Sequence, residues 1–185
     1  MNKDVSVWPL SLRLAHWASA ALVVTALGLG TYMVQLVHDP AERFELTQTH
    51  KSIGVAVLAL TIVRLCLRTL VNAPRPEPAA PLVLLAAKVV HIVLYALLLV
   101  MPLSGWLMAT TTPVRVPTFV FGVVELPYPL SPDLTTYRVA HTIHVVSAVF
   151  LASFVVLHIA AALIHAFLWE DRTFARIWWR RSPAP

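Results

Sequence analysis

The sequence predicts an all-α membrane protein, a bundle of four transmembrane helices with both termini in the cytoplasm. Of its 185 residues, 58% are hydrophobic and only 12% are charged, and the mean hydropathy is +0.75. A soluble domain of this length rarely has such a composition. Four apolar stretches are each long enough to cross a bilayer, and we expect them to form a single domain over residues 1–185. The four stretches are residues 10–37, 50–71, 82–109 and 137–169.

The basic residues predict the orientation, because cytoplasmic ends of membrane spans carry an excess of Lys and Arg. Of the 14 Lys and Arg residues, all but Arg43, Lys51, Arg115 and Arg138 fall at the ends that would face the cytoplasm. This topology accounts for the formal net charge of +5 without any need for nucleic-acid binding, which we discard.

The first stretch begins after Pro9, a residue that the first helical turn tolerates. Arg13 and His16 interrupt the apolar run too early for a cleavable signal peptide, so we expect a retained span. His16 then lies about two turns inside the cytoplasmic end. Gly30 lies fourteen residues further on, on nearly the same face but near the other surface. Its missing side chain allows either close helix–helix contact or clearance for a flat cofactor.

The second stretch follows a polar link, residues 38–48, which we expect outside the membrane on the periplasmic side. His50 opens the helix and therefore lies near the surface opposite to His16. Arg64 shares the face of His50 at the cytoplasmic depth, and Arg68 is one turn beyond it. These arginines either pair with carboxylates of a cofactor bound between the helices or anchor the cytoplasmic end by snorkelling.

Four prolines in residues 72–81 predict a short extended turn between antiparallel neighbours. The third stretch then places His91 on the cytoplasmic side and Gly105 near the periplasm, which repeats the His-to-Gly pattern of the first helix. Pro102 removes one backbone hydrogen bond within this stretch, so we expect a kink there.

The next link, residues 110–136, is far longer than helix packing needs, and long loops are usually functional or disordered. Its apolar part, residues 119–126, is too short to span a bilayer. We therefore expect an interfacial segment that caps the periplasmic mouth of the bundle.

The last stretch carries four histidines inside an otherwise apolar run. His144 and His158 return to within about 40° of the same helix face and lie about 21 Å apart along it. His165 lies about 10 Å beyond His158, and His141 lies about 60° round from His144. One helix face thus holds imidazoles at two depths, and ionisable residues inside a span are functional candidates by default.

Sorted by depth, the histidines form two layers, and each layer can supply a pair of ligands from facing helices. The cytoplasmic layer holds His16, His91, His158 and His165, and the periplasmic layer holds His50, His141 and His144. Two neutral imidazoles complete the coordination of a haem iron, which then carries electrons one at a time and does not readily bind oxygen. The single cysteine, Cys66, excludes a C-x-x-C-H attachment, so any haem must be held non-covalently.

Other uses of the histidines stay open at this point. A non-haem metal normally adds carboxylate ligands, and the spans contain no Asp or Glu at these depths. Proton relays and plain interhelical hydrogen bonds need no cofactor, and the competing class is a non-redox bundle such as a small transporter.

Six segments, taken in order, resemble the prokaryotic cytochrome b561 family. Their order, spacing and sidedness agree over nearly the whole chain. The segments are residues 12–17, 49–54, 62–68, 88–91, 102–105 and 157–165.

The resemblance implies a multi-pass protein of the bacterial inner membrane, with a single cytochrome b561-like domain and two non-covalent b haems. It also implies two pairs of iron ligands, one periplasmic and one cytoplasmic: His50 with His144, and His16 with His158. His91 and His165 match further family histidines.

Within this family, compact members include a superoxide:ubiquinone oxidoreductase, and larger relatives are membrane subunits of hydrogenases and formate dehydrogenases. The lack of a fifth helix or a soluble domain favours the free-standing type. We therefore expect an enzyme that oxidises periplasmic superoxide and reduces ubiquinone. The alternative is a di-haem subunit that passes electrons between a partner dehydrogenase or hydrogenase and quinone.

Residues near the two surfaces are candidates for substrate contact. His165, with His91 as a second residue, can hydrogen-bond a quinone carbonyl at the cytoplasmic boundary. Lys51, Arg115 and Arg138 can draw superoxide, a small anion, toward the periplasmic haem. The plainer interpretation is a histidine facing headgroups and solvated loop charges. The expected partners are membrane lipid, quinone and superoxide, and a homo-oligomer or a redox partner subunit stays open.

Overall fold

The computed structural model describes residues 7–114 and 116–178, and the predicted all-α bundle is confirmed. Four helices in the described residues are long and apolar enough to cross a membrane. They are α1 (Leu10–Gln35), α2 (Pro40–Leu70), α3 (Pro81–Thr111) and α4 (Leu134–Phe167). Arg115, one of the predicted substrate residues, lies outside the described residues. We call the side where α1 begins and α4 ends the terminal side, and the opposite side the hairpin side.

Two helices begin earlier than the sequence analysis expected, because an aspartate caps each of them. The Asp39 carboxylate accepts a hydrogen bond from the Glu42 N–H at 2.9 Å, and Pro40 occupies the first turn, so α2 starts there and the expected start at residue 50 is wrong. The location of residues 38–48 outside the membrane stays a prediction. The Asp133 carboxylate accepts from the Thr136 N–H at 2.7 Å and starts α4. The hydrogen bonds from Thr136 hold the pKa of Asp133 below its usual range.

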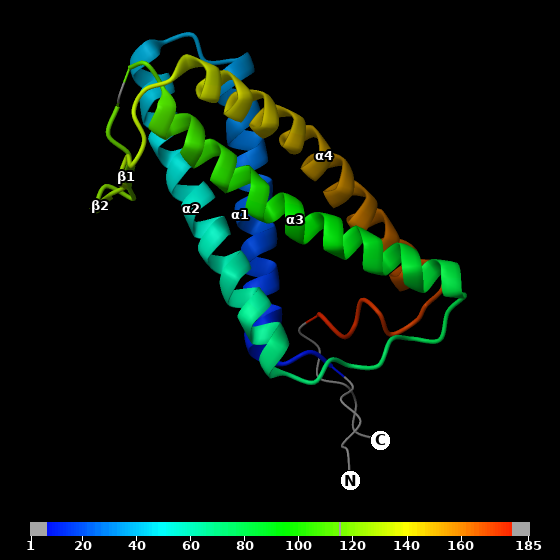
Figure 1. Ribbon diagram of the computed structural model, residues 1–185. Coiled ribbons are helices and arrows are strands. Elements are labelled where there is room, and N and C mark those ends of the chain that lie inside the picture. Colours follow the sequence, from blue (N-terminus) through cyan, green and yellow to red (C-terminus); the bar gives the residue numbers. More distant parts are fainter. Residues whose placement is uncertain (1–6, 115, 179–185) are drawn as a thin grey trace.

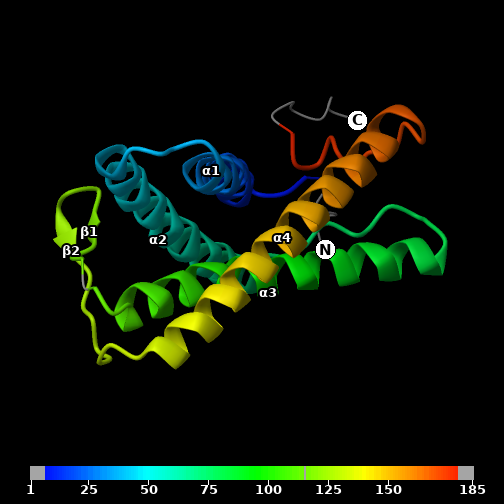
Figure 2. The ribbon, with the colours of Figure 1, turned by 90° about the horizontal axis from the view of Figure 1, so that it is seen from above.

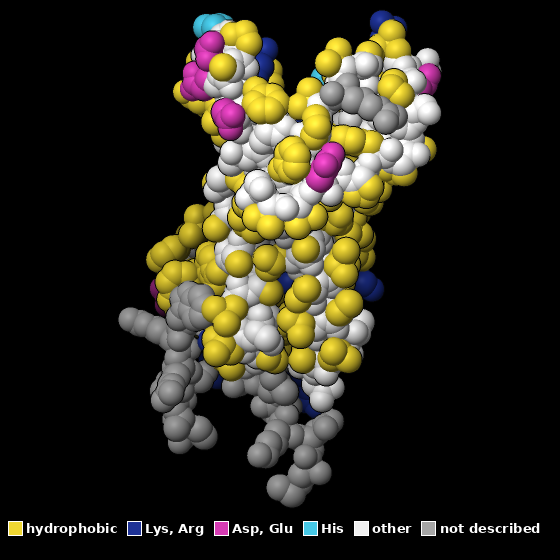
Figure 3. Space-filling model, turned by 90° about the vertical axis from the view of Figure 1, so that its left-hand side faces the viewer, with side chains coloured by type: hydrophobic (Ala, Val, Ile, Leu, Met, Phe, Trp, Pro, Cys, Tyr) yellow, Lys and Arg dark blue, Asp and Glu magenta, His cyan; other side chains and the backbone are white. Residues whose placement is uncertain are grey.

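The helices pack in sequence order, α1 on α2, α2 on α3 and α3 on α4 (Figures 1 and 2). Their shared core is apolar and lies at mid-depth; its buried members are Val23, Ile53, Val57, Leu98 and Leu151. Most other large apolar side chains are exposed, as expected for helices that face lipid. On the face shown in Figure 3, hydrophobic side chains cover the middle and most acidic side chains gather toward the hairpin side.

A small β-hairpin that the sequence analysis did not predict occupies the link between α3 and α4. Strands β1 (Phe119–Val120) and β2 (Val124–Glu125) pair antiparallel, with the first residue of β1 opposite the last residue of β2. Three residues, 121–123, connect the strands, and the Val123 N–H donates to the Val120 carbonyl at 3.0 Å to close the turn. Phe121 and Gly122, the central residues of this turn, have φ values of 49° and 73°, and positive φ at both positions is typical of the turns that join antiparallel strands.

The hairpin packs on α2 through one buried hydroxyl. Ser52 is 2% exposed, and its Oγ accepts a hydrogen bond from the Phe121 N–H at 2.9 Å. The same hydroxyl lies 2.9 Å from the Gln48 carbonyl, to which it donates. The apolar segment of the long link is thus held against a membrane helix.

Replacing Ser52 with Ala should loosen the hairpin, because the Phe121 N–H then loses its acceptor in a buried position. We expect a loss of about 1–3 kcal/mol of local stability, the usual cost of a buried unpaired donor. Limited proteolysis of the purified protein should cleave the hairpin faster in this variant. Ser153→Ala is the matched control, because the exposed Ser153 hydroxyl bonds only the Val149 carbonyl of its own helix. Equal cleavage of the two variants would contradict the prediction.

Candidate functional site

On the terminal side, three histidines from three helices meet. The rings of His16 on α1 and His158 on α4 have centroids 6.2 Å apart and an interplanar angle of 65°. His91 on α3 approaches His158 more closely, with a centroid separation of 5.2 Å. The Nδ1 of His91 lies 2.7 Å from the Ala87 carbonyl of its own helix, which can only accept, so His91 carries its proton on Nδ1.

On the hairpin side, His50 on α2 faces His144 on α4. Their ring centroids are also 6.2 Å apart, with an interplanar angle of 80°. Both rings are half-buried in the bundle. The structure therefore brings together the two pairs that the sequence analysis proposed as ligands, one pair on each side of the apolar core.

The separation within each pair fits two imidazoles that bind one metal ion from opposite sides. An imidazole nitrogen binds a metal at about 2 Å, and adding the ring radius on both sides puts the centroids roughly 6 Å apart. The pairs His16–His158 and His50–His144, both at 6.2 Å, match this value. The His91–His158 separation of 5.2 Å is shorter than the geometry requires.

Hydrogen bonds fix the tautomer of one of these rings. The Nδ1 of His144 lies 3.0 Å from the Met101 carbonyl and 3.2 Å from the Ser104 hydroxyl. Because a carbonyl only accepts, the ring proton sits on Nδ1, and Nε2 keeps a lone pair for a metal ion. The Nδ1 of His50 is buried, and among the described residues only the backbone of Ala26 on α1 is in position to interact with this ring, without full hydrogen-bond geometry.

Two glycines make room for the hairpin-side pair. A Cβ on Gly30 would lie 3.2 Å from Cε1 of His50, and a Cβ on Gly105 would lie 3.1 Å from Cε1 of His144. Both distances are shorter than an ordinary van der Waals contact. The sequence analysis offered helix contact or cofactor clearance as the reason for these glycines, and the structure shows that each admits the imidazole of a neighbouring helix.

The two predicted arginines differ in their surroundings. The Arg64 guanidinium lies 3.1 Å from Nδ1 of His16 and 5.3 Å from the ring centroid of Tyr95, and its Nε is buried without a partner. A buried cation inside a span calls for an anionic partner, and no described carboxylate forms an ion pair with it. Arg68 is exposed and lies over the ring of Trp8 at 5.2 Å, as expected for an anchor at the membrane surface.

The remaining two histidines of α4 lie apart from the pairs. His141 is exposed beside Tyr137, with ring centroids 6.2 Å apart. His165 hydrogen-bonds through Nδ1 to Oδ2 of Asp171 at 2.5 Å. Burial raises the pKa of Asp171, but hydrogen bonds from His165 and Thr173 outweigh it and leave that pKa below its usual value. The sequence analysis missed Asp171, because it lies beyond the helix and only the turn after α4 brings it to His165.

The predicted substrate residues lie on the hairpin side. The Lys51 ammonium, half-buried, donates to the Thr118 hydroxyl at 2.9 Å, beside the strand of the hairpin. Arg138 is exposed near the start of α4 and lines a shallow surface hollow with Val139, Thr142 and Ile143. These positions leave the steering role of both residues a prediction.

A membrane bundle whose helices present paired histidines at metal-binding separation defines a class of protein, the membrane cytochromes that hold haem between helices. Comparison with known proteins agrees: the family model of the prokaryotic cytochrome b561 matches residues 7–180. Cytochrome b561 homolog 2 of Escherichia coli (strain K12) is 31% identical over 163 residues, which are 88% of this chain and 86% of that relative. The chain belongs to the prokaryotic cytochrome b561 family. It is a multi-pass protein of the inner membrane that transfers electrons with haem b.

Replacing Gly30 with Ala should weaken haem binding, because the new Cβ pushes the His50 ring by a few tenths of an ångström. Gly28→Ala is the matched control on the same helix, since nothing lies within 4 Å of a Cβ there. Ala raises helix propensity in both variants by about 0.5–1 kcal/mol, so only the ring contact distinguishes them. We expect less haem per polypeptide in Gly30→Ala, measured as the pyridine haemochrome, and an unchanged ratio in Gly28→Ala. Equal haem content would show that the ring has room to move.

Proposed function

We propose that this protein carries electrons through two b haems, one held by His50 and His144 and the other by His16 and His158, from superoxide to ubiquinone. The observation that carries the proposal is the equal 6.2 Å separation of the two pairs, both of which include a histidine of α4. Two superoxide radicals lose one electron each and become oxygen. One quinone gains the two electrons and two protons and becomes quinol.

Bound haem supplies one-electron carriage, and two imidazole ligands leave no open position for oxygen. The chain determines where the two sites lie and keeps water out of the region between them. His144 and His158 are about 21 Å apart along α4, so the two sites lie near opposite surfaces. Val23, Val57 and Leu151 belong to the buried apolar core and lie between them in helix register, which excludes water from the middle of the path.

Arg64 fits a carboxylate of the terminal-side haem. A guanidinium can only donate, so its contact at 3.1 Å requires a lone pair on Nδ1 of His16. A neutral ring of that tautomer carries its proton on Nε2, which then cannot bind iron. If His16 held iron through Nε2, its ring proton would sit on Nδ1, and the Arg64 guanidinium would then be available to an anion at the same depth, such as a haem carboxylate.

Ligand replacement tests the two sites separately. His144→Ala should remove the hairpin-side haem and His158→Ala the terminal-side haem, so each variant should keep about half of the b-type absorbance of the reduced protein. Redox titration of each variant should show a single component. His141→Ala is the control, because this exposed residue is a neighbour of His144 in sequence but belongs to neither pair. A His144→Ala protein with unchanged spectra would overturn the assignment and leave His141 as the candidate ligand.

We assign superoxide to the hairpin side, where Lys51 and Arg138 lie. What supports this is position: Lys51 adjoins His50 in sequence, and no described acidic residue forms an ion pair with it. A local positive field raises the encounter rate of a small anion and is screened by salt. Ubiquinone then reacts on the terminal side, where His165 and His91 lie near the surface.

Stopped-flow reduction of the oxidised protein by superoxide tests both the donor and the steering. At low ionic strength Lys51→Glu or Arg138→Glu should slow haem reduction by about threefold to tenfold, and added salt should remove the difference. Lys88→Glu is the control, because Lys88 is exposed near the start of α3 on the terminal side. Rates insensitive to salt and to charge reversal would remove steering. A rate no faster than that of free haem would remove superoxide as the donor.

A further inference from the structure

We propose that Asp171 is a positioning residue for quinone reduction. Its carboxylate holds a proton on Nδ1 of His165, so that Nε2 is the ring nitrogen that takes up a further proton and donates it to the quinone carbonyl oxygen. This inference rests on the proposed reduction of quinone on the terminal side. It adds a residue that lies outside the membrane helices and outside every motif that the sequence analysis used.

The contact between the two side chains is short and partly shielded. Nδ1 of His165 lies 2.5 Å from Oδ2 of Asp171, and the side chains are 16% and 24% exposed. An ionised carboxylate can only accept, so Nδ1 carries a hydrogen whether the ring is neutral or charged. Hydrogen bonds to an ionised acceptor are shorter and stronger than neutral ones. The edge of the Trp169 ring system lies against the imidazole at a centroid distance of 4.6 Å.

The backbone after α4 is bent to make this contact. Glu170 has a φ of 50°, in the left-handed region that side chains other than glycine seldom adopt. The turn lets the Asp171 N–H donate to the His165 carbonyl at 3.1 Å. Oδ1 of Asp171 accepts from the Thr173 N–H at 2.7 Å, which fixes the second oxygen of the carboxylate. A strained residue that persists because its surroundings fix it is a recurrent feature of functional sites.

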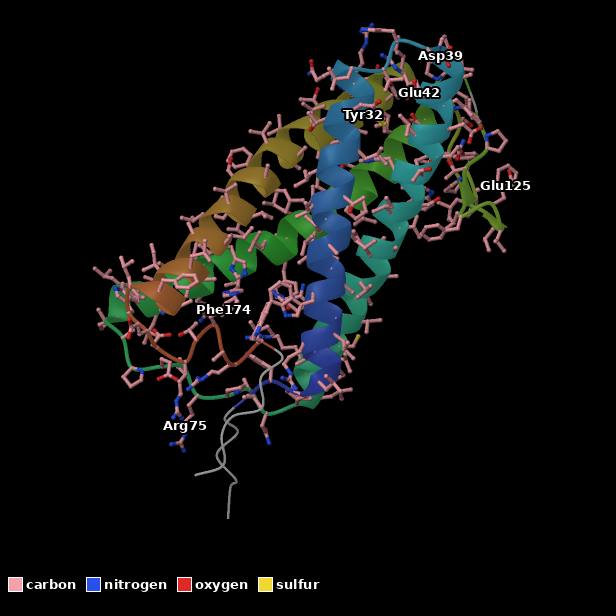
Figure 4. All side chains as sticks on the ribbon, turned by 180° about the vertical axis from the view of Figure 1, so that it is seen from behind. Tyr32, Asp39, Glu42, Arg75, Glu125 and Phe174 are labelled. Carbon is pink, nitrogen blue, oxygen red and sulfur yellow. The ribbon has the colours of Figure 1, made fainter. Side chains whose placement is uncertain are left out.

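The segment that begins at Asp171 leads toward His16 and His158, the histidine pair on the same side. Residues 171–178, which include Phe174, run from the end of α4 to the start of α1 (Figures 1 and 4). The indole of Trp17 donates to the Ile177 carbonyl at 3.1 Å and contacts the His16 ring at a centroid distance of 5.4 Å. His165 itself is about 10 Å from His158 along α4. A quinone beside His165 is therefore close to the terminal-side haem.

This arrangement supplies one of the two protons that quinone reduction consumes, and water supplies the other to the second carbonyl oxygen. When the ring holds two protons, the Nε2–H bond breaks and an O–H bond forms on the quinone carbonyl oxygen, while the electrons arrive by way of the haem. Water on that side then returns the proton to Nε2. Asp171 stays ionised throughout and balances the charge of the ring, as the carboxylate does in other carboxylate–histidine pairs.

Asp171→Asn separates positioning from mere folding of the turn. The asparagine Oδ1 can still accept from the Thr173 N–H, but its NH₂ group cannot accept from His165. We expect the ring to change tautomer, with the proton moving from Nδ1 to Nε2. The ¹⁵N spectrum of histidine-labelled protein reports this directly, with the His165 resonance assigned by its loss in His165→Gln.

The kinetic measurement is reoxidation of the dithionite-reduced protein by ubiquinone-1. Asp171→Asn should lower the maximal rate by at least about tenfold at unchanged haem content, since positioned proton transfer contributes 10²–10⁴-fold. Asp133→Asn is the matched control: it removes the carboxylate that caps the other end of α4 and should leave the rate unchanged. Asp171→Glu, which keeps a carboxylate acceptor, should recover most of the rate.

The outcomes are distinct. If ubiquinone-1 does not reoxidise the wild-type protein, the proposed quinone function falls and this inference falls with it. If the wild type is reoxidised and Asp171→Asn is equally fast, only the role of Asp171 is overturned. Should Asp171→Asn fail to fold, the wild-type spectrum still decides, because an unprotonated Nδ1 on His165 overturns the proposal.

Discussion

The structure depends on one geometric constraint: at two depths of the same bundle, imidazoles on different helices face each other with ring centroids 6.2 Å apart. α4 contributes one histidine to each pair, so the fourteen-residue spacing of His144 and His158 sets both depths at once. The other helices have to match this register. α2 does so with His50 on one side of the core, and α1 does so with His16 on the other.

The polar groups buried in the bundle differ in how their hydrogen bonds are satisfied. The buried hydroxyls of Ser19 and Thr61 donate to carbonyls of their own helices at 2.7 Å, so they demand nothing from neighbouring helices. Nε of Arg64, by contrast, is buried without a partner among the described residues, as are Oε1 of Gln48 and the Nε atoms of Arg13 and Arg176 away from the histidine pairs. An unpaired polar group is costly inside a membrane, and the Arg64 guanidinium adjoins the His16 ring, so an anion bound at that depth would complete its pairing.

The sequence predicted most where the pattern is periodic. Helical spacing was enough to place His16, His50, His144 and His158 in two layers, because a regular helix relates position in sequence directly to depth and face. The start of α2 was not predicted, because the polarity of residues 38–48 suggested a link, although an aspartate followed by a proline, Asp39 and Pro40, is a common pattern at a helix start. The role of Gly30 could not be predicted, since it depends on which side chain of a neighbouring helix meets it. The contact of Asp171 with His165 depends on a left-handed residue that no motif announces.

The two ends of the bundle are closed by different means, and this difference bears on which substrate each end serves. On the hairpin side, the glycines bring the helices against the imidazoles, and a small hairpin docks on α2 through Ser52. On the terminal side, α3 and α4 lean away from α1 and α2, and residues 171–178 pass between the two pairs of helices (Figure 4). That segment is attached through Asp171 to α4, through Ile177 to α1, and through Arg176, which pairs with Glu77, to the link between α2 and α3. A closely packed end admits a diatomic anion more readily than a ring with a long apolar tail, whereas an end closed by a segment rather than by helix packing can accept the larger molecule. The proposed function also accounts for the position on the terminal side of the one histidine with a fixed carboxylate partner among the described residues: the proposed reduction of quinone would consume protons there, whereas oxidation of superoxide would not.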